Sequence, residues 1–481
     1  MLRRVLRDSV LYSASALLSR GVAIVLVPLY TRFLQPAEYG ALDLLTVVAT
    51  LVNYLVLLEI SQGVARVYAD AKTERDKQEC VSTALWFTTA AYGVFLILAL
   101  PFSAAIAGLL LDSPKWSEAV RAITLAIAAN GLFFMLQDLL RWQLQPWRHG
   151  LASIVYTAVS TAVGVAFVVG ADSGVPGILY GQCAGATAGF IAAWANGAAK
   201  HWRLAFLWKR WQEMVSYSAP QMLSSIAAYF SLYIDRLMIK EFMTLDDVGV
   251  YGIGARFASV VALLMTGFQS ALVPLVFQNF SSPETPPQLA RVFRYFLTLA
   301  ISAVLLLSGF SRDLVWLFTT AHYYAAWSVV PLLATAVLLA NMYIFTLGVY
   351  IARRMMLVIA INIGAALINL AGNLLLIPLF GLLGAAVATV LSGLVAFSSY
   401  VYCNQRYYPI PFEWGKIAGG VLVGAGFAGI LAGIQASSWP SVTVFVVNTA
   451  LWVLGSTGVA FCVLGGRELQ LAARKLWERM A

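Results

Sequence analysis

The sequence has 481 residues, of which 61% are hydrophobic and only 11% are charged. Soluble domains carry about a quarter charged residues, so this composition excludes a soluble globular protein and predicts a membrane protein. The net charge of +9 is spread over short connections between apolar runs, which argues against nucleic-acid binding. We predict no metal site and no cofactor, because the cysteines are isolated and have no metal-ligand or redox spacing. They are Cys80, Cys183, Cys403 and Cys462.

Apolar runs long enough to cross a bilayer, about 20 residues each, predict about fourteen transmembrane helices. The first six cover 9–33, 41–69, 81–110, 118–145, 150–171 and 177–198. The next six cover 213–241, 247–278, 289–310, 323–350, 355–378 and 382–404, and the last two cover 415–435 and 440–464. Residues 466–481 are predicted to form an amphipathic helix that lies on the membrane surface.

The distribution of Lys and Arg predicts the orientation of these helices. Most of the 31 basic residues fall in alternate connections, which the positive-inside rule places in the cytoplasm. With an even number of helices, both termini are then cytoplasmic.

An internal repeat divides the predicted helices into two halves. The connection at 32–40 and the connection at 241–249 share a Phe, an acidic residue and a Gly in register. Gly177 and Gly381, each followed by two aliphatic residues, match at nearly the same offset. We therefore predict two parallel six-helix lobes with a substrate site between them. The predicted domains are an N-lobe at 1–200, a C-lobe at 201–405, two extra helices at 406–465 and the tail at 466–481.

Three groups of residues carry a resemblance to a known family. Residues 28–40 resemble the first connection of polysaccharide flippases (Wzx-like, the polysaccharide transporter branch) in the multidrug/oligosaccharidyl-lipid/polysaccharide (MOP) exporter superfamily. Residues 235–240 and 248–256 resemble that family's seventh and eighth helices, and residues 373–389 resemble its eleventh and twelfth. The arginine-aspartate signature of lipid II flippases is absent from the first helix, where Arg20-Gly21-Val22 stands.

The resemblance implies an all-α fold of two helical bundles in a V, as in the MATE and other MOP proteins, with two extra C-terminal helices. It also implies a transporter, not an enzyme, in the inner (cytoplasmic) membrane of a bacterium. The implied substrate is an undecaprenyl-pyrophosphate-linked oligosaccharide for O-antigen, capsule or exopolysaccharide, moved by alternating access. The implied partners are membrane lipid, a coupling ion such as H⁺ or Na⁺, and the polymer-synthesis machinery.

Four arginines within the apolar runs are candidate substrate ligands. A charge at mid-membrane costs about 2.5–3.5 kcal/mol on insertion scales and therefore requires a reason. Arginine presents a fork of donors that binds two phosphate oxygens, so a cavity lined by these residues suits a pyrophosphate head group. The alternative is that they pair with buried carboxylates and hold helices together. The arginines are Arg20, Arg66, Arg236 and Arg256, and the carboxylates are Asp43, Glu59, Asp138 and Asp235.

Other intramembrane polar residues extend this candidate site. Tyr229 and Tyr233 share a helix face with Arg236, where they either stack on a sugar ring or pack between helices. Glu59 is the candidate coupling-ion site, because a buried carboxylate can change protonation as access alternates. Its alternative role is an ion pair with an arginine of a neighbouring helix. Asp138 and Arg141 are spaced for a local ion pair.

Two other functions compete with flipping. A multidrug cation antiporter of the same superfamily requires a cavity rich in carboxylates and aromatic residues, whereas intramembrane arginines favour an anion. A membrane glycosyltransferase or polymerase usually has a long extracytoplasmic loop with catalytic residues. Here the longest outer connection, near 311–322, is short and contains one acid, Asp313.

Overall fold

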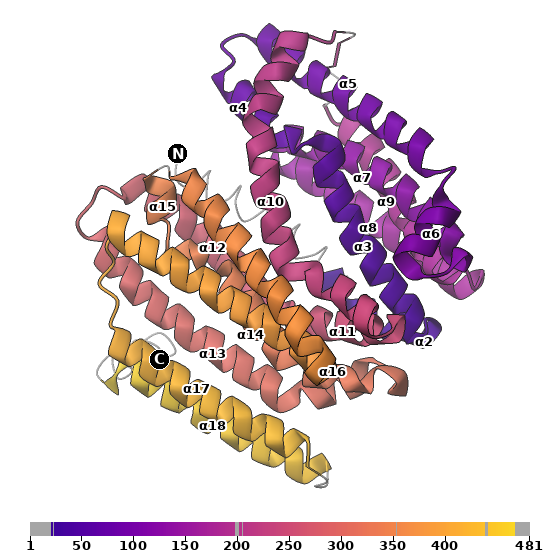
Figure 1. Ribbon diagram of the computed structural model, residues 1–481. Coiled ribbons are helices and arrows are strands. Elements are labelled where there is room, and N and C mark those ends of the chain that lie inside the picture. Colours follow the sequence, from indigo (N-terminus) through magenta and orange to yellow (C-terminus); the bar gives the residue numbers. More distant parts are fainter. Residues whose placement is uncertain are drawn as a thin grey trace, which may run out of the picture. The chain divides into compact units, whose positions relative to one another are not determined.

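The computed structural model describes residues 21–22, 24–197, 202–203, 205–352, 354–437 and 441–466. Helices are the regular elements throughout these ranges (Figure 1). Nine described helices are long and apolar enough to cross a membrane, and a bent pair, Ala321–Ser328 with Val330–Phe345, makes a tenth. The chain is therefore an all-α, multi-pass membrane protein, as its composition predicts. Arg20 and residues 467–481 of the predicted tail lie outside the described residues.

The first of two compact units covers Met1–Gly249. A 3₁₀ turn, Pro114–Trp116, leads into α7, and a π-helical turn, Ala166–Gly170, extends α8. The first residues of α11 also belong to this unit. Its helices are α2 (Val27–Phe33), α3 (Pro36–Leu57), α4 (Ile60–Asp70), α5 (Glu74–Ala99), α6 (Ser103–Leu111), α7 (Ser117–Trp142), α8 (Pro146–Val165), α9 (Gly174–Ala195), α10 (Trp208–Phe242) and α11 (Leu245–Ala258).

Glycines set how closely α9 packs against its neighbours. Gly181 and Gly185 lie one turn apart on one face of α9. A Cβ at Gly181 would lie 2.6 Å from the Cα of Gly164, and one at Gly185 would lie 2.7 Å from the carbonyl oxygen of Tyr156, both in α8. Small residues at such spacing let transmembrane helices approach backbone to backbone. The close packing of α8 and α9 therefore depends on these glycines, which have no side chain to separate the two backbones.

Helix α4 is packed against the first part of α10. Gly63 has no room for a side chain, because its Cβ would run into the backbone carbonyl of Met214 in α10. Around this contact the buried apolar side chains of α4, α5, α7 and α10 form one cluster that includes Ile60, Val64, Val81, Leu136, Leu139 and Met214. This cluster holds the helices whose polar residues line the cavities described below.

The two connections of the predicted repeat begin their following helices in the same way. At the start of α3, the Gln35 amide donates to the Glu38 carboxylate at 2.8 Å in a capping box. At the start of α11, the Thr244 amide donates to the Asp247 carboxylate at 3.1 Å, and the Asp247 amide donates to the Thr244 hydroxyl at 3.3 Å. Such reciprocal bonds satisfy amides that a helix N-terminus leaves unpaired.

The glycines of the same two connections meet each other. A Cβ on Gly40 would overlap the carbonyl oxygen of Leu245 and lie 2.9 Å from the amide nitrogen of Gly249. In return, a Cβ on Gly249 would overlap the carbonyl oxygen of Pro36. The reciprocal contact supports the proposal that 32–40 and 241–249 are equivalent parts of a duplicated sequence.

The second unit covers Val250–Ala481 and contains the rest of α11. Short 3₁₀ helices, Ala321–Ser328 and Met342–Phe345, flank α14. Its other helices are α12 (Val260–Asn279), α13 (Thr285–Phe318), α14 (Val330–Asn341), α15 (Gly348–Ile351), α16 (Met355–Tyr407), α17 (Trp414–Gln435) and α18 (Ser441–Leu464).

Helix α16 consists of two helices joined at a sharp bend. Its 53 residues would span about 80 Å as one helix, far more than the ~30 Å hydrocarbon layer. Gly381 has φ 56° and ψ −133°, a backbone conformation that only glycine adopts readily. Beyond the bend the chain returns along itself, since the Ser392 hydroxyl donates to the Ala365 carbonyl at 2.7 Å. The bend falls between the two segments predicted at 355–378 and 382–404.

The last two helices pack on α13, beside which they lie in Figure 1. Asn448 of α18 donates to the Gly309 carbonyl at 2.6 Å, and Gln435 of α17 bonds to the same oxygen. Trp452 donates to the Ser302 carbonyl at 3.0 Å. These buried polar contacts attach the two extra helices to the second unit.

Candidate functional site

The second predicted span is broken in its middle. Leu58 and Glu59 have φ of 51° and 49°, so α3 ends at Leu57 and α4 begins at Ile60. The left-handed conformation is unfavourable for residues that carry a side chain, and two in succession store strain of the kind found at functional sites. Glu59, at this break, lines a cavity whose mainly apolar wall carries several polar side chains.

This helix-break cavity has a volume of about 300 Å³ and lies within the first unit. Serine and carboxylate groups meet along its wall, where the Ser61 hydroxyl donates to Asp138 at 2.7 Å. Asp138 also pairs with Arg141 at 2.8 Å, which confirms the local pair predicted from their spacing. The lining residues are Thr50, Asn53, Tyr54, Leu57, Glu59, Ile60, Ser61, Gln62, Tyr92, Gly131, Phe134, Met135 and Asp138.

The two tyrosines of the predicted site lie on α10, and one of them contacts a residue that lines this cavity. Tyr229 and Tyr233 pack with ring centroids 4.5 Å apart. The Tyr229 ring meets the edge of Tyr54, a lining residue, at 6.0 Å. The aromatic contact between helices, one of the two roles considered for these residues, is therefore present.

Arg236 is enclosed by carboxylates. Its guanidinium lies 2.7 Å from Asp235 and 3.4 Å from Asp43 of α3, and it stacks over the Tyr233 ring at 5.1 Å. The exposed fraction of these three charged side chains is 6% for Arg236, 0% for Asp235 and 12% for Asp43. Buried charges are stable when they are paired in this way. Of the two roles considered for the arginines, Arg236 therefore has the second: it pairs with buried carboxylates and links α10 to α3.

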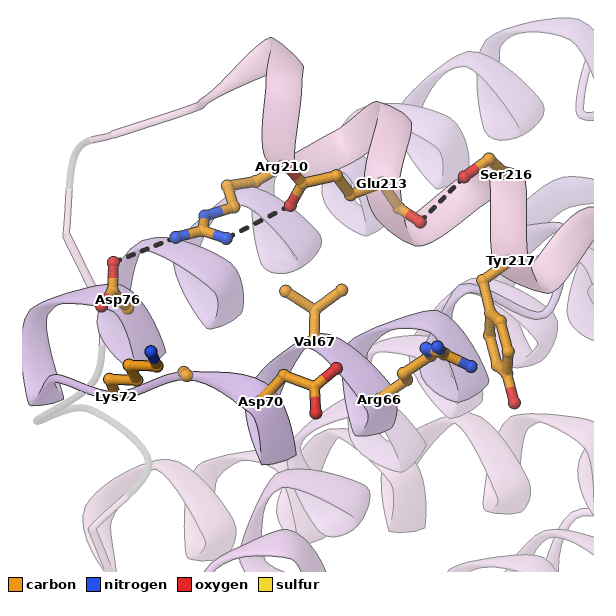
Figure 2. A pocket seen from close by; sticks show the side chains of 10 residues that line it. Arg66, Val67, Asp70, Lys72, Asp76, Arg210, Glu213, Ser216 and Tyr217 are labelled. Atoms are coloured by element: carbon orange, nitrogen blue, oxygen red, sulfur yellow. Dashed lines mark hydrogen bonds and ion pairs between the residues drawn. The ribbon is translucent and has the colours of Figure 1, made fainter.

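Arg66 lines a second, larger cavity of about 660 Å³ at the far end of α4, here called the arginine cavity (Figure 2). Its guanidinium lies over the Tyr217 ring of α10 at 4.8 Å. Across the cavity, Arg210 bonds to Asp76 at 3.0 Å and to Glu213 at 3.2 Å. The lining residues are Arg66, Val67, Asp70, Ala71, Lys72, Asp76, Arg210, Glu213, Ser216 and Tyr217.

Of the four predicted arginines, the three that lie in the described residues have different surroundings. Within the first unit, Arg66 lines a cavity and Arg236 is held in a buried ion-pair network. Arg256 lies on α11 in the second unit and is half-buried. Glu59 lines the helix-break cavity, where Ser225 of α10 hydrogen-bonds to its carboxylate.

The residues that complete both cavities are not predicted by the sequence pattern. Tyr217 and Arg210 come from α10, and Asn53, Tyr92 and Ser61 are ordinary polar residues within apolar runs. The signal available was helical spacing, because Gln62 and Arg66 are four apart and so share one face of α4. Their partners on other helices give no such signal.

Known proteins resemble this chain in sequence. Residues 5–280 match the family described as "Polysaccharide biosynthesis protein". A curated relative, the probable low-salt glycan biosynthesis flippase Agl15 of Haloferax volcanii, is 26% identical over 232 residues. That match covers 47% of this chain and 49% of the relative, so it extends over about half the length of each protein.

Solved structures share the fold. The lipid II flippase MurJ in an inward closed conformation superposes with a TM-score of 0.74 at 13% identity, covering 94% of this chain and 98% of that one. An inward-facing multidrug resistance MATE family transporter of the MOP superfamily gives 0.66 at 10% identity, covering 83% and 95%. The MATE transporter VcmN of Vibrio cholerae in its bent form gives 0.56 at 14% identity, covering 84% and 98%. The fold is thus that of the MOP superfamily, and the family match, which covers more than half of the sequence, shows that the chain belongs to the polysaccharide biosynthesis protein family.

Proposed function

We propose that this protein moves a lipid-linked oligosaccharide across a bacterial inner membrane by alternating access. The proposed substrate is carried on undecaprenyl pyrophosphate, for O-antigen, capsule or exopolysaccharide synthesis, and passes from the cytoplasmic to the periplasmic leaflet. Both termini are proposed to be cytoplasmic. The family membership, the MurJ-like fold and the relationship to a probable glycan flippase support this assignment.

The observation that carries the proposal is the chemistry of the helix-break cavity. Its lining combines carboxylates, amides and hydroxyls with the aromatic rings of Tyr54, Tyr92 and Phe134. A sugar ring presents hydroxyl groups that donate to and accept from such side chains, and its apolar face packs on aromatic rings. A cavity of this kind within a membrane-spanning unit accommodates a polar sugar while the carrier's hydrocarbon chain remains in lipid.

We place the coupling ion at Glu59. Its carboxylate stands at a helix break, where the end of α3 leaves backbone carbonyls without intrahelical partners. Discontinuous helices of transporters bind coupling ions at such ends. Asp138 is a poorer candidate, because Arg141 and Ser61 already occupy its oxygens.

A second candidate function is export of an organic cation. It is favoured by Glu59 and by the three aromatic residues in the same cavity, since a cation is attracted to carboxylates and to ring faces. Arg66, which is exposed in the arginine cavity, favours the anionic substrate, because a guanidinium repels a cation.

Reconstitution distinguishes these functions from each other and from an enzyme. Purified protein in liposomes is given a fluorescent lipid-linked oligosaccharide, and the fraction reaching the opposite leaflet is measured with a membrane-impermeant quencher. The glycan is then recovered and its length is compared with the input. Flipping with an unchanged glycan supports the proposal. Movement of an organic cation without flipping supports the second candidate, and a longer glycan indicates a polymerase.

A further inference from the structure

The connection between α9 and α10 carries exposed aromatic side chains. We call its residues 202–203 and 205–209 the linker segment; α10 begins within it. Trp202, Phe206 and Trp208 are all exposed, with 45% of Phe206 and 60% of Trp208 accessible. Aromatic residues in such positions are typical of the boundary between a membrane and water, where the ring enters the apolar layer and the chain stays near the head groups.

Side chains of α5 hold the backbone of the linker segment. The Ser82 hydroxyl bonds to the carbonyl oxygen of Arg203, and the Trp86 indole donates to the same oxygen at 3.3 Å. The Leu207 amide donates to the Thr83 hydroxyl at 3.1 Å. These bonds satisfy polar groups that a non-helical backbone leaves without partners. The linker segment can therefore lie against apolar surroundings without losing hydrogen bonds.

The same contacts place the linker segment at one boundary of the apolar layer. Helix α5 has 26 residues and is about 39 Å long, more than the ~30 Å hydrocarbon layer. All but one of residues 74–79 are charged, so the excess length falls at this end and the apolar layer begins near Cys80. The α5 residues that hold the linker segment follow Cys80 within two turns. The linker segment therefore lies at the level of the lipid head groups.

The charge of this region is positive. Four Lys and Arg residues and no acidic residue occur in the sixteen positions that precede Glu213. Arg210 is neutralised, because it pairs with both Asp76 and Glu213 (Figure 2). Arg203 and Lys209 are exposed, and among the described residues no ion pair joins either of them to a carboxylate. Two cations thus stand beside exposed aromatic rings.

We propose that the linker segment is a binding surface for anionic phospholipid head groups. Its aromatic rings enter the interfacial layer, and Arg203 and Lys209 bind the lipid phosphates. An acidic protein would complement the two charges but would leave the rings without an apolar partner, whereas a lipid supplies both. Because α10 begins within the linker segment and Arg210 joins it to α5, a bound lipid also stabilises the start of α10. This inference goes beyond glycan movement and does not depend on it.

Competition experiments test the chemistry of the partner. Purified full-length protein in detergent binds a fluorescent phosphatidylglycerol, which is displaced by unlabelled phosphatidylglycerol, phosphatidylcholine, water-soluble glycerophosphoglycerol or polyglutamate. Phosphatidylglycerol should compete at least about tenfold better than phosphatidylcholine, because two juxtamembrane charges contribute to its binding. The head group alone should compete poorly, since it lacks the apolar part. Equal competition by phosphatidylcholine or by the head group would overturn the proposal, and stronger competition by polyglutamate would instead identify a surface for an acidic protein.

Variants connect this binding to the linker segment. Arg203→Gln and Lys209→Gln are each expected to weaken phosphatidylglycerol binding about fivefold and to leave phosphatidylcholine binding unchanged. Phe206→Ser should weaken both lipids alike. The double variant Arg291→Gln/Arg406→Gln is the matched control, since it removes two exposed arginines of the second unit. Wild-type affinity in Arg203→Gln/Lys209→Gln, with wild-type thermal unfolding, would overturn the site, as would an equal loss in the control.

Hydrogen exchange locates the bound lipid. Phosphatidylglycerol should slow the exchange of amides at 205–212 in wild type, because it stabilises the Leu207–Thr83 bond and the first turn of α10. This protection should be lost in Arg203→Gln/Lys209→Gln. Protection that appears only in other helices would place the lipid elsewhere and contradict the proposal. None of these measurements requires flipping, so the binding surface and the proposed function can fail separately.

Discussion

Arg236 and Arg66 lie in the same unit and on interacting helices, yet their surroundings give them different roles. Arg236 is buried between Asp43 and Asp235, so its donors are used within the protein. Arg66 rests on the Tyr217 ring and faces a cavity. A buried charge that is enclosed by opposite charges is compensated within the protein, whereas a charge that is oriented but not neutralised is able to bind a ligand.

Arg236→Ala is expected to lower the free energy of unfolding by about 3–5 kcal/mol, because it removes the guanidinium that pairs with two buried carboxylates. Thermal unfolding in detergent measures this change. Arg75→Ala is the control and is expected to have little effect, since Arg75 is largely exposed. Equal unfolding temperatures for the two variants would show that the buried network does not stabilise the protein.

Glu59→Gln is expected to abolish the dependence of flipping on a proton or sodium gradient, because an amide neither titrates nor supplies the charge that a cation requires. The assay compares initial flipping rates with and without each gradient in proteoliposomes. Glu79→Gln is the control, because Glu79 pairs with Arg75 outside both cavities. A Glu59→Gln protein that still responds fully to the gradient would remove Glu59 as the coupling site.

At the scale of elements, two local features shape the first unit. One is a helix break with irregular backbone geometry, and the other is a pair of glycines that lets two helices pack closely. The break at Leu58 and Glu59 interrupts what the sequence predicts as one apolar helix, and Glu59 lines a cavity beside it. Gly40 and Gly249 let the starts of α3 and α11 touch through their backbones. These features position the candidate site more directly than the helix lengths do.

Gly40→Ala is expected to destabilise the protein by about 1–3 kcal/mol, the usual cost of overpacking a close contact, because its Cβ would overlap the Leu245 carbonyl. The unfolding temperature in detergent is the measurement. Gly93→Ala is the matched control, since a Cβ at Gly93 in α5 meets nothing within 4 Å and alanine favours the helix. If Gly40→Ala is as stable as Gly93→Ala, the backbone crossing is not tight in the protein.

A pH effect is expected where α17 begins. The hydrogen bond from Lys416, together with Arg294 at 2.9 Å, lowers the pKa of Glu413 below its usual value near 4.5. A carboxylate with a lowered pKa in the folded state contributes stability above the unfolded value, and this contribution is lost as the pH falls through the folded value. Unfolding temperatures measured from pH 6 downward should therefore fall below about pH 4.5 less steeply in Glu413→Gln than in wild type. Glu284→Gln, an exposed glutamate at the start of α13, should keep the wild-type slope.

At the scale of the whole molecule, the sequence predicts the class of fold well and the site only in part. Apolar runs of about 20 residues locate helices because burial in lipid requires them. The apolar character of a whole run does not reveal the break at Leu58 and Glu59, because the break contains neither glycine nor proline. Glu59 and Arg66 stand out as charges within an apolar run. Tyr217, the partner of Arg66, does not, because it comes from α10 and is placed by tertiary packing.

The central claim is that this member of the polysaccharide biosynthesis protein family flips a lipid-linked glycan through the cavities of its first unit. The most direct measurement is the initial flipping rate of a fluorescent undecaprenyl-pyrophosphate-linked oligosaccharide in proteoliposomes. The rate is compared between wild type, Arg66→Gln and the control Arg75→Gln, at matched protein density. We predict rapid flipping by wild type and Arg75→Gln, and a rate at least tenfold lower for Arg66→Gln. A wild-type rate no higher than that of protein-free liposomes would contradict the account.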